Sequence, residues 1–273
     1  MMKIEDWIGK KREAHELVTE RLFREFKGTF GDILQEDNLL PGLHWCLLPE
    51  IYPPADLGRD GHPKTGLFLP DLGLPRRMWA GGNIRFHNTF SIGEVITRTS
   101  NISDIKFKEG RSGKLGFVTL EHEYNCEGEL RVSEVQNIVY REDHSKNSPT
   151  KSVEQAEPWD VMHQFEAQPS STLLFRYSAM TFNGHRIHYD KQYAIETEGY
   201  DGLVVHGPIQ ATWMQLLATQ TLKRLPKNFT YRGLAPLVCD RPAVVEVTPD
   251  KDGLKLRVRD LEANVVTMSA VAN

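Results

Sequence analysis

The stretch Phe175-Arg-Tyr-Ser-Ala-Met-Thr-Phe-Asn-Gly-His-Arg-Ile-His-Tyr-Asp190, followed by Gly202-Leu-Val-Val-His-Gly-Pro208, places amide and imidazole groups on turns between apolar segments. Apolar residues alternate with polar or small ones from Leu173 to Tyr177, which predicts a strand. Asn183-Gly184 predicts a tight turn directly after it. Polar side chains gathered beyond the end of a strand indicate a functional site in addition to a core.

The second segment leads into a helix. A turn at Asp201-Gly202 precedes its apolar run, and residues Ile209 to Leu225 have the composition of an apolar helix with Pro208 in the first turn. Gly207 would then present a free backbone N–H at the positive end of that helix.

The two segments together resemble the signature of the MaoC-type (R)-specific enoyl-CoA hydratases, which reads Ser-Gly-Asp-x-Asn-Pro-x-His-x-Asp-x-x-x-Ala before a Leu-His-Gly turn. His188, Asp190 and Ala194 keep the His-x-Asp-x-x-x-Ala spacing. The same register places Asn183 where that family has its catalytic aspartate, and His185 where it has an asparagine. The acid/base pair of the family is therefore altered in this chain.

The altered motif is similar to one branch of the family, the mitochondrial-type hydroxyacyl-thioester dehydratases and the bacterial mesaconyl- and itaconyl-CoA hydratases. Asp60-Gly-His-Pro63 and Pro75-Arg-Arg-Met-Trp-Ala-Gly-Gly82 support that branch. The resemblance extends over nearly the whole chain, from Asp6-Trp-Ile-Gly to the C-terminal strands. It implies an α+β double hot-dog fold, with two antiparallel sheets that each wrap a central helix and a degenerate N-terminal half.

The pattern along the chain agrees with two helix-plus-sheet units. Residues 11–30 have helical spacing, and residues 41–75 are rich in proline and glycine, which predicts a loop. Two groups of strands follow, at residues 83–86, 94–99, 115–124 and 134–140 and at residues 229–232, 243–247, 254–258 and 264–268, with turns predicted at Glu109-Gly110, Ser112-Gly113, Glu127-Gly128 and Asp252-Gly253. We therefore predict an N-terminal hot-dog half at 1–142, a polar linker at 143–169, and a C-terminal half at 170–273 that carries the motif.

Hydration of an enoyl thioester needs a group that activates water, a group that orients it and donors for the enolate-like oxygen. We expect His188 to take the proton of water, since imidazole titrates near neutral pH. Asn183 can orient that water but has no useful basicity. The backbone N–H of Gly207 would polarise the thioester carbonyl.

Three more histidines could act or orient groups in the site. His185 is either a second acid/base group or a structural hydrogen bonder, His206 precedes the glycine of the helix turn, and His62 could reach the pocket from the other half of the chain. His185, His188 and His206 also resemble a ligand set for a metal ion. The family resemblance implies no metal and no cofactor, because CoA enters as part of the substrate.

Other residues are candidates for contacts with the substrate: Arg76, Arg77, Trp79, Val205 and Arg186. Arginines suit CoA phosphates or a substrate carboxylate, although solvated or interface pairs explain them equally well. Trp79 and Trp45 could line the channel, although buried aromatic residues are more often part of a core. We expect Asp190 to cap a short helix that begins at Lys191.

The bulk properties exclude several classes of protein. The 273 residues carry a net charge of −4 without a basic run, which argues against nucleic acid as a partner. No apolar run approaches the roughly 20 residues that a membrane helix needs. The N-terminal residues resemble neither a signal nor a transit peptide, so we expect a cytoplasmic protein. Cys46, Cys126 and Cys239 are odd in number and far apart, which favours reduced thiols.

We therefore expect a lyase that binds an acyl-CoA and adds water reversibly to a short branched dicarboxylic enoyl-CoA, itaconyl-CoA or mesaconyl-CoA, giving citramalyl-CoA. One alternative is a 3-hydroxyacyl-thioester dehydratase of fatty-acid synthesis. Another is a non-catalytic acyl-thioester-binding protein, for which the loss of the aspartate at position 183 is the only support. By analogy with the fold, we expect a homodimer.

Overall fold

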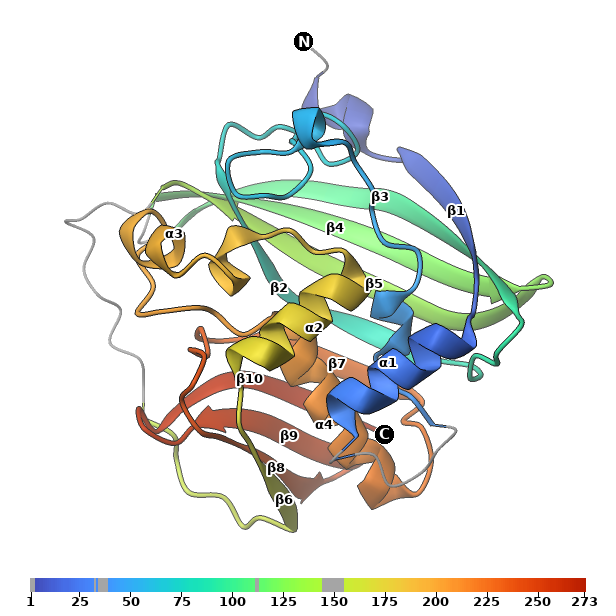
Figure 1. Ribbon diagram of the computed structural model, residues 1–273, viewed down its shortest axis with the longest axis vertical. Helices are drawn as coiled ribbons and strands as arrows, with labels where there is room; N and C mark the ends of the chain where they lie inside the picture. The colour runs from blue at the N-terminus through green and yellow to red at the C-terminus, as the bar shows by residue number, and fades with distance from the viewer. Residues whose placement is uncertain (1–2, 32, 34–38, 111–112, 144–154) are drawn as a thin grey trace.

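The computed structural model describes residues 3–31, 33, 39–110, 113–143 and 155–273. In these segments ten strands form one antiparallel sheet in the order β1-β3-β4-β5-β2-β7-β10-β9-β8-β6 (Figure 1). The strands of the first part of the chain lie on one side of this order and those of the second part lie on the other. β2 and β7 meet in the middle.

The four strands predicted in the N-terminal half are present and are longer than the sequence indicated: β2 (Arg76–Phe86), β3 (Val95–Gly110), β4 (Gly113–Cys126) and β5 (Glu129–Arg141), with β1 (Lys11–Leu17) in addition. β3, β4 and β5 form a meander, whereas β2 pairs with β5 and β7 and not with β3. The predicted turn at Glu127-Gly128 is present, and both residues have positive φ. Gly110 pairs with Gly113 across the next predicted turn, whose Ser112 lies outside the described residues.

The prediction of a helix over residues 11–30 was wrong for its first part. Residues Lys11–Leu17 form β1, which pairs with β3, and their side chains alternate between exposed and half-buried positions. The helix α1 covers only Glu20–Phe30, and Thr19 caps it by accepting from Leu22 N at 3.2 Å. The period of two in residues 11–17 was hidden by the apolar helix face that follows it.

The C-terminal strands are β6 (His163–Ala167), β7 (Asn228–Gly233), β8 (Ala243–Asp250), β9 (Gly253–Asp260) and β10 (Val265–Ala272). All four predicted strands of this part are present. β6 falls within the stretch 143–169 that we predicted as a linker, and it pairs with β8 at the edge of the sheet. Residues 144–154 of that stretch lie outside the described residues.

The strand predicted at Leu173 to Tyr177 is in fact part of a helix, α2 (Ser171–Thr181). Ser170 caps it by accepting from Leu173 N at 3.2 Å. Leu174 and Tyr177, three positions apart, are buried, whereas Phe175 is 69% exposed. Spacing of i, i+3 is that of a helix face, and it outweighed the apparent alternation.

Helix α4 (Gly207–Leu222) is the central helix that was predicted at 209–225. Every residue from Ile209 to Thr219 is buried, because strands β6 to β10 contact the helix and the loop at Gly42 packs on Thr212. In contrast, α1 buries only Leu22, Phe26 and Phe30. Among its described residues, the N-terminal half thus has no equally enclosed helix, which agrees with its prediction as degenerate.

Pairing of β2 with β7 joins the two predicted sheets edge to edge. Gly82 lies opposite Tyr231 in this register. An added Cβ at Gly82 would lie 2.5 Å from Tyr231 Oη, so a residue with a side chain would push these strands apart. Glycine at this position therefore allows the close approach on which the continuous sheet depends.

None of the helices in the described part of the chain is both long and apolar enough to span a membrane. Cys46, Cys126 and Cys239 are buried free thiols, which confirms the prediction of reduced cysteines.

A buried carboxyl group links the two halves at this junction. Glu134 of β5 accepts from Tyr231 Oη of β7 at 2.8 Å and from Trp45 Nε1 at 3.1 Å. Burial raises its pKa from 4.5 to about 7, although the hydrogen bonds from Tyr231 and Trp45 oppose that rise. The group therefore stays protonated in the folded protein at pH values where it is ionised in the unfolded chain.

We predict that the unfolding free energy of Glu134→Gln, measured relative to that of wild type, is higher at pH 8 than at pH 5. A raised folded pKa means that wild-type stability declines as pH rises from 4.5 to about 7 and then levels off. Glutamine keeps an oxygen acceptor and does not titrate, so the difference in unfolding free energy should grow by on the order of 3 kcal/mol. Urea unfolding of both proteins at the two pH values measures it. An equal difference at both pH values would contradict the buried, protonated Glu134.

Candidate active site

The histidine-bearing turn begins where α2 ends. Phe182 closes the helix with φ +49°, and Asn183 Oδ1 accepts from His185 N at 2.9 Å. A short 3₁₀ turn (Arg186–His188) follows, and Asp190 then caps α3 (Lys191–Glu196) by accepting from Tyr193 N at 2.9 Å. The predicted turn and cap are both confirmed. The oxygen of Asn183 is used within the turn, which leaves its NH₂ group to face a ligand.

His188 has its hydrogen-bonding role fixed by the backbone. Its Nδ1 lies 2.6 Å from the carbonyl oxygen of Val204. A carbonyl only accepts, so Nδ1 carries the proton and Nε2 has a free lone pair. Burial lowers the pKa of His188 to about 3, although the bond to Val204 opposes this. His188 is therefore neutral near pH 7 and can accept a hydrogen bond from water.

His206 lies directly against His188. The two rings stack with centroids 3.5 Å apart, and His206 Nε2 lies 2.9 Å from Ser178 Oγ of α2. Burial, and then the electrostatic interaction with the neighbouring histidine rings, lower the pKa of His206 far below its usual value. A ring that stays neutral in this position can orient His188, as predicted, while it does not compete for protons.

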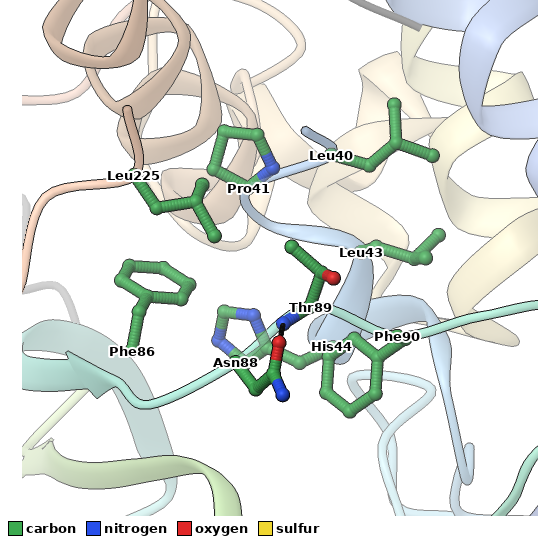
Figure 2. A pocket seen from close by; sticks show the side chains of 9 residues that line it. All are labelled: Leu40, Pro41, Leu43, His44, Phe86, Asn88, Thr89, Phe90 and Leu225. Carbon is green, nitrogen blue, oxygen red and sulfur yellow. Dashed lines mark hydrogen bonds between the residues drawn. The ribbon is translucent and has the colours of Figure 1, made fainter. Parts of the chain in front are cut away.

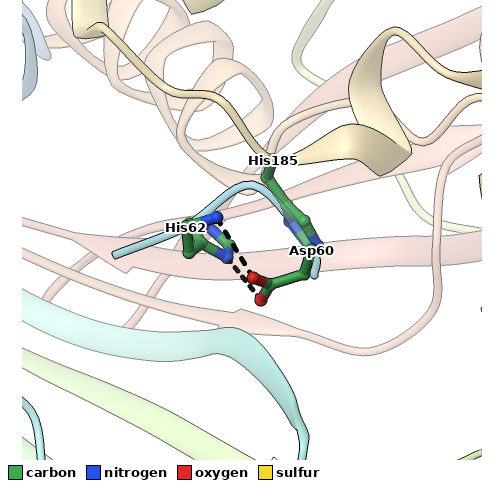
Figure 3. Close-up of side chains that lie close together, drawn as sticks. All are labelled: Asp60, His62 and His185. Carbon is green, nitrogen blue, oxygen red and sulfur yellow. Dashed lines mark hydrogen bonds and ion pairs between the residues drawn. The ribbon is translucent and has the colours of Figure 1, made fainter. Parts of the chain in front are cut away.

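A loop of the N-terminal half reaches this turn. Arg186 N donates to the carbonyl oxygen of Asp60 at 2.8 Å. Gly61, with φ +86°, packs so closely that an added Cβ would lie 1.9 Å from the carbonyl oxygen of Gly184. The contact brings His62 against His185, with ring centroids 4.1 Å apart (Figure 3). The site therefore contains residues from both halves, as the prediction for His62 required.

Asp60 is the carboxylate of this cluster. Its Oδ2 lies 3.0 Å from His62 Nδ1 and 3.2 Å from Arg77 Nη2, and its Oδ1 accepts from His62 N at 3.1 Å. Burial raises the pKa of Asp60, but the hydrogen bond from His62 and the charges of His62, Arg77 and His185 outweigh that effect, and the net pKa lies well below its usual range. Asp60 is therefore an anion.

His185 is placed between the other rings. It lies 4.1 Å from His62 and meets the ring of His188 edge to face at 5.3 Å. Burial and the neighbouring histidines lower its pKa far below the usual value. His185 thus stays neutral and is poorly suited to hold a proton.

Gly207 begins α4, as predicted, and Trp79 of β2 covers it. An added Cβ at Gly207 would lie 2.4 Å from Trp79 Cε3. The Trp79 ring stacks on Tyr231 at 4.4 Å, and Trp45 meets both rings edge to face. The hydrogen bonds of Glu134 hold Tyr231 and Trp45 and thereby fix this aromatic wall beside the positive end of α4.

The residues that could hold a metal ion differ from the predicted set His185, His188 and His206. Asp60, His62 and His185 offer ligand atoms within 4.8 Å of one another (Figure 3). These are residue types that bind zinc or other transition metals. However, Arg77 contacts the same carboxylate oxygen of Asp60 as His62 does, so a permanent positive charge opposes a cation there.

The remaining predicted binding residues lie around this centre. Arg76 is buried and forms an ion pair with Glu198, so its charge is already balanced. Arg186 is paired with Asp190 at 2.7 Å. Val205 is buried, and its N–H donates to Leu237 O at 2.8 Å, which positions the chain just before His206.

An apolar pocket lies at the other end of α4 (Figure 2). It is lined by Leu40, Pro41, Leu43, His44, Phe86, Asn88, Thr89, Phe90 and Leu225. Leu225 follows the C-terminal end of the 16-residue helix α4. At 1.5 Å per residue that end is about 24 Å from Gly207, so the pocket is distinct from the histidine cluster.

Sequence reasoning missed Asp60, Ser178 and Val204 as parts of the site. Asp60 stands two positions before His62, a spacing at which a carboxylate can meet both the backbone and the ring of the histidine, and this signal was available. Ser178 and Val204 are recognised only once α2 and the segment before α4 are placed beside the turn.

Comparison with known proteins agrees with this arrangement. Residues 42–239 match the family model of hydroxyacyl-thioester dehydratase type 2. The mesaconyl-C(4)-CoA hydratase of Chloroflexus aurantiacus is 41% identical over 82% of this chain and 80% of its own length. The chain belongs to the hydroxyacyl-thioester dehydratase type 2 family. It is therefore an enzyme of the hydratase/dehydratase type, a lyase.

Solved structures confirm the fold. HtdX of Mycobacterium tuberculosis aligns with a TM-score of 0.68 at 15% identity and covers 96% of this chain and 99% of its own. A second protein from that organism, whose structure has a double hot-dog fold, aligns with a TM-score of 0.59 at 10% identity over 97% of this chain and 95% of its own. The predicted double hot-dog architecture is confirmed, with its two sheets fused through β2 and β7.

We predict that Gly61→Ala destabilises the protein by at least about 2 kcal/mol more than Gly66→Ala, because overpacking adds to backbone strain. Both glycines have positive φ, +86° and +91°, so the strain of an added Cβ is similar. Only Gly61 has a backbone atom in the way, whereas nothing lies within 4 Å of a Cβ at Gly66. Thermal or urea unfolding of the two variants measures the difference. Equal losses would show that the Gly61–Gly184 contact does not hold the loop in place.

Proposed function

We propose that this protein adds water reversibly to the double bond of a short branched dicarboxylic enoyl-CoA, mesaconyl-CoA or itaconyl-CoA, and forms citramalyl-CoA. The observation that carries the reaction type is His188, whose Nδ1 donates to Val204 O and whose Nε2 is thereby free, close to the start of α4. The relative that acts as a mesaconyl-C(4)-CoA hydratase supports the substrate class.

The proposed mechanism uses only side chains and backbone groups. His188 Nε2 accepts a hydrogen bond from water, and the NH₂ group of Asn183 helps to orient it. As the water oxygen bonds to the β-carbon, the π electrons move toward the thioester oxygen, which the N–H of Gly207 stabilises. The proton that the water loses then adds to the α-carbon, so the whole of water is added across the double bond. No cofactor takes part in this scheme.

The substrate carboxylate requires a positive partner. Arg77 is held against Asp60 at the edge of the histidine cluster, with 10% of its side chain exposed. We propose Arg77 as that partner, since a guanidinium can share two anions through its separate N–H groups. Trp79 over Gly207 would limit the length of the acyl group at this end of α4.

The alternative reaction is dehydration of a 3-hydroxyacyl thioester in fatty-acid synthesis. The name of the matching family model favours it. Cytoplasmic localisation and a homodimer stay predictions from the sequence.

We predict that the purified protein hydrates mesaconyl-CoA or itaconyl-CoA faster than crotonyl-CoA, and that His188→Ala lowers kcat by at least about 100-fold through loss of the water contact. Loss of absorbance of the enoyl thioester measures both rates. Preference for crotonyl or longer acyl groups would favour the fatty-acid alternative. A protein that binds these thioesters without any turnover would be a binding module.

We predict that Gly207→Ala also lowers kcat by at least about 10-fold, because its Cβ would collide with Trp79 and displace the groups at the start of α4. Gly28→Ala is the matched control, since it is also a helical glycine and nothing lies within 4 Å of its added Cβ. Steady-state kinetics on the preferred thioester compare the two. Equal activity of Gly207→Ala and wild type would remove Gly207 from the mechanism.

A further inference from the structure

The buried histidines of the cluster are poor acceptors for the proton that water loses during hydration. His185, His188 and His206 are buried, and burial lowers the pKa of each ring. Among the described residues, no hydrogen bond or ion pair joins any of these three rings to a carboxylate, although His185 lies within 4.8 Å of Asp60. A group that removes a proton from water must hold it until the α-carbon takes it, and these rings are poorly suited to carry that charge.

His62 differs from the other three rings in two respects. Its side chain is 27% exposed, so water still solvates it, and it forms an ion pair with Asp60. Because the Asp60 carboxylate only accepts, His62 Nδ1 carries the proton of this 3.0 Å bond and Nε2 is free. This is the arrangement in which a carboxylate orients an imidazole base and stabilises its protonated form.

The fold places this pair where the chain lacks a carboxylate. Asn183 cannot take a proton, yet the turn that begins with it is the one that the Asp60-Gly-His loop contacts through Arg186 N and Gly184 O. The ring of His62 packs on His185, which in turn packs on His188. The N-terminal half thus supplies a carboxylate–imidazole pair, Asp60 and His62, to this site.

We infer that His62 is the catalytic acid/base of this site and that Asp60 is its positioning residue, while His188 orients the water. This inference rests on the proposed hydratase function. In the forward direction, His62 Nε2 takes one proton of water as the oxygen bonds to the β-carbon. The same proton then passes from His62 to the α-carbon, so water is added in full and the ring returns to its neutral form.

The test compares His62→Gln and Asp60→Asn with wild type on the preferred enoyl-CoA. His62→Gln should lower kcat by at least about 100-fold and Asp60→Asn by at least about 10-fold, with much smaller changes in KM. His15→Gln is the matched control, because His15 also lies beside a carboxylate, Glu13 at 3.2 Å, but is exposed and on β1. The control should keep wild-type turnover.

The pH profile of kcat separates positioning from a purely structural role of Asp60. Protonated His62 cannot accept from water, so kcat should fall at low pH. The groups that face His62 are the charged Asp60, Arg77 through the same carboxylate, and the titratable ring of His185. Loss of the negative charge in Asp60→Asn should move the fall to lower pH. A fall that stays in place would overturn the role of Asp60.

The outcomes distinguish this inference from the proposed function. If wild type turns over an enoyl-CoA and His62→Gln does so within a few-fold of it, the inference fails and the hydratase assignment stands. If wild type turns over none of the thioesters, the hydratase assignment fails and the inference fails with it. Unfolding curves of both variants establish that each is folded, and the half-exposed position of His62 makes this the expected result for His62→Gln.

Discussion

Contact between two glycine turns holds the catalytic centre together. Gly61 and Gly184 come from opposite halves of the chain, and neither leaves room for a side chain at the point where their backbones meet. The bond from Arg186 N to Asp60 O fixes the register of this contact. The meeting of the two halves at the site depends on it, because it decides which side chains of the N-terminal loop face the histidines of the C-terminal half.

The junction between the two sheets supports this contact. Fusion of β2 with β7 makes the two hot-dog sheets one body, and the carboxyl group of Glu134 links their strands through Tyr231. Trp79 extends from the same junction to cover the start of α4. The N-terminal half therefore contributes to the site a loop with Gly61 and His62, and Trp45 and Trp79 of the aromatic wall.

Differences in burial and in charged partners distinguish His62 from the other three histidines of the cluster. Rings without a charged partner stay neutral when they are desolvated, so they suit hydrogen bonding to water and to one another. A ring beside a carboxylate can carry charge, and the cluster has one such ring, His62, among the described residues. In the proposed mechanism, Asp60 of the N-terminal half supplies the carboxylate that Asn183 lacks.

Local signals in the sequence were sufficient for the Asn183-Gly184 turn, the cap at Asp190 and the start of α4 at Gly207-Pro208, because neighbouring residues determine each of them. They misled at Leu173 to Tyr177, where alternation and helical spacing are both present and burial of Leu174 and Tyr177 decided for the helix. The partners of His62 and His188 depend on contacts between distant segments, so the roles of Asp60 and Val204 required the structure.

A crystal structure of the protein with a saturated analogue of the preferred acyl-CoA would show whether residues of both halves surround the reacting carbons. We expect the thioester oxygen at the N–H of Gly207 and the β-carbon facing Nε2 of both His62 and His188. An acyl group that lies instead in the apolar pocket near Leu225, with its β-carbon away from His62, would contradict a catalytic centre built from both halves.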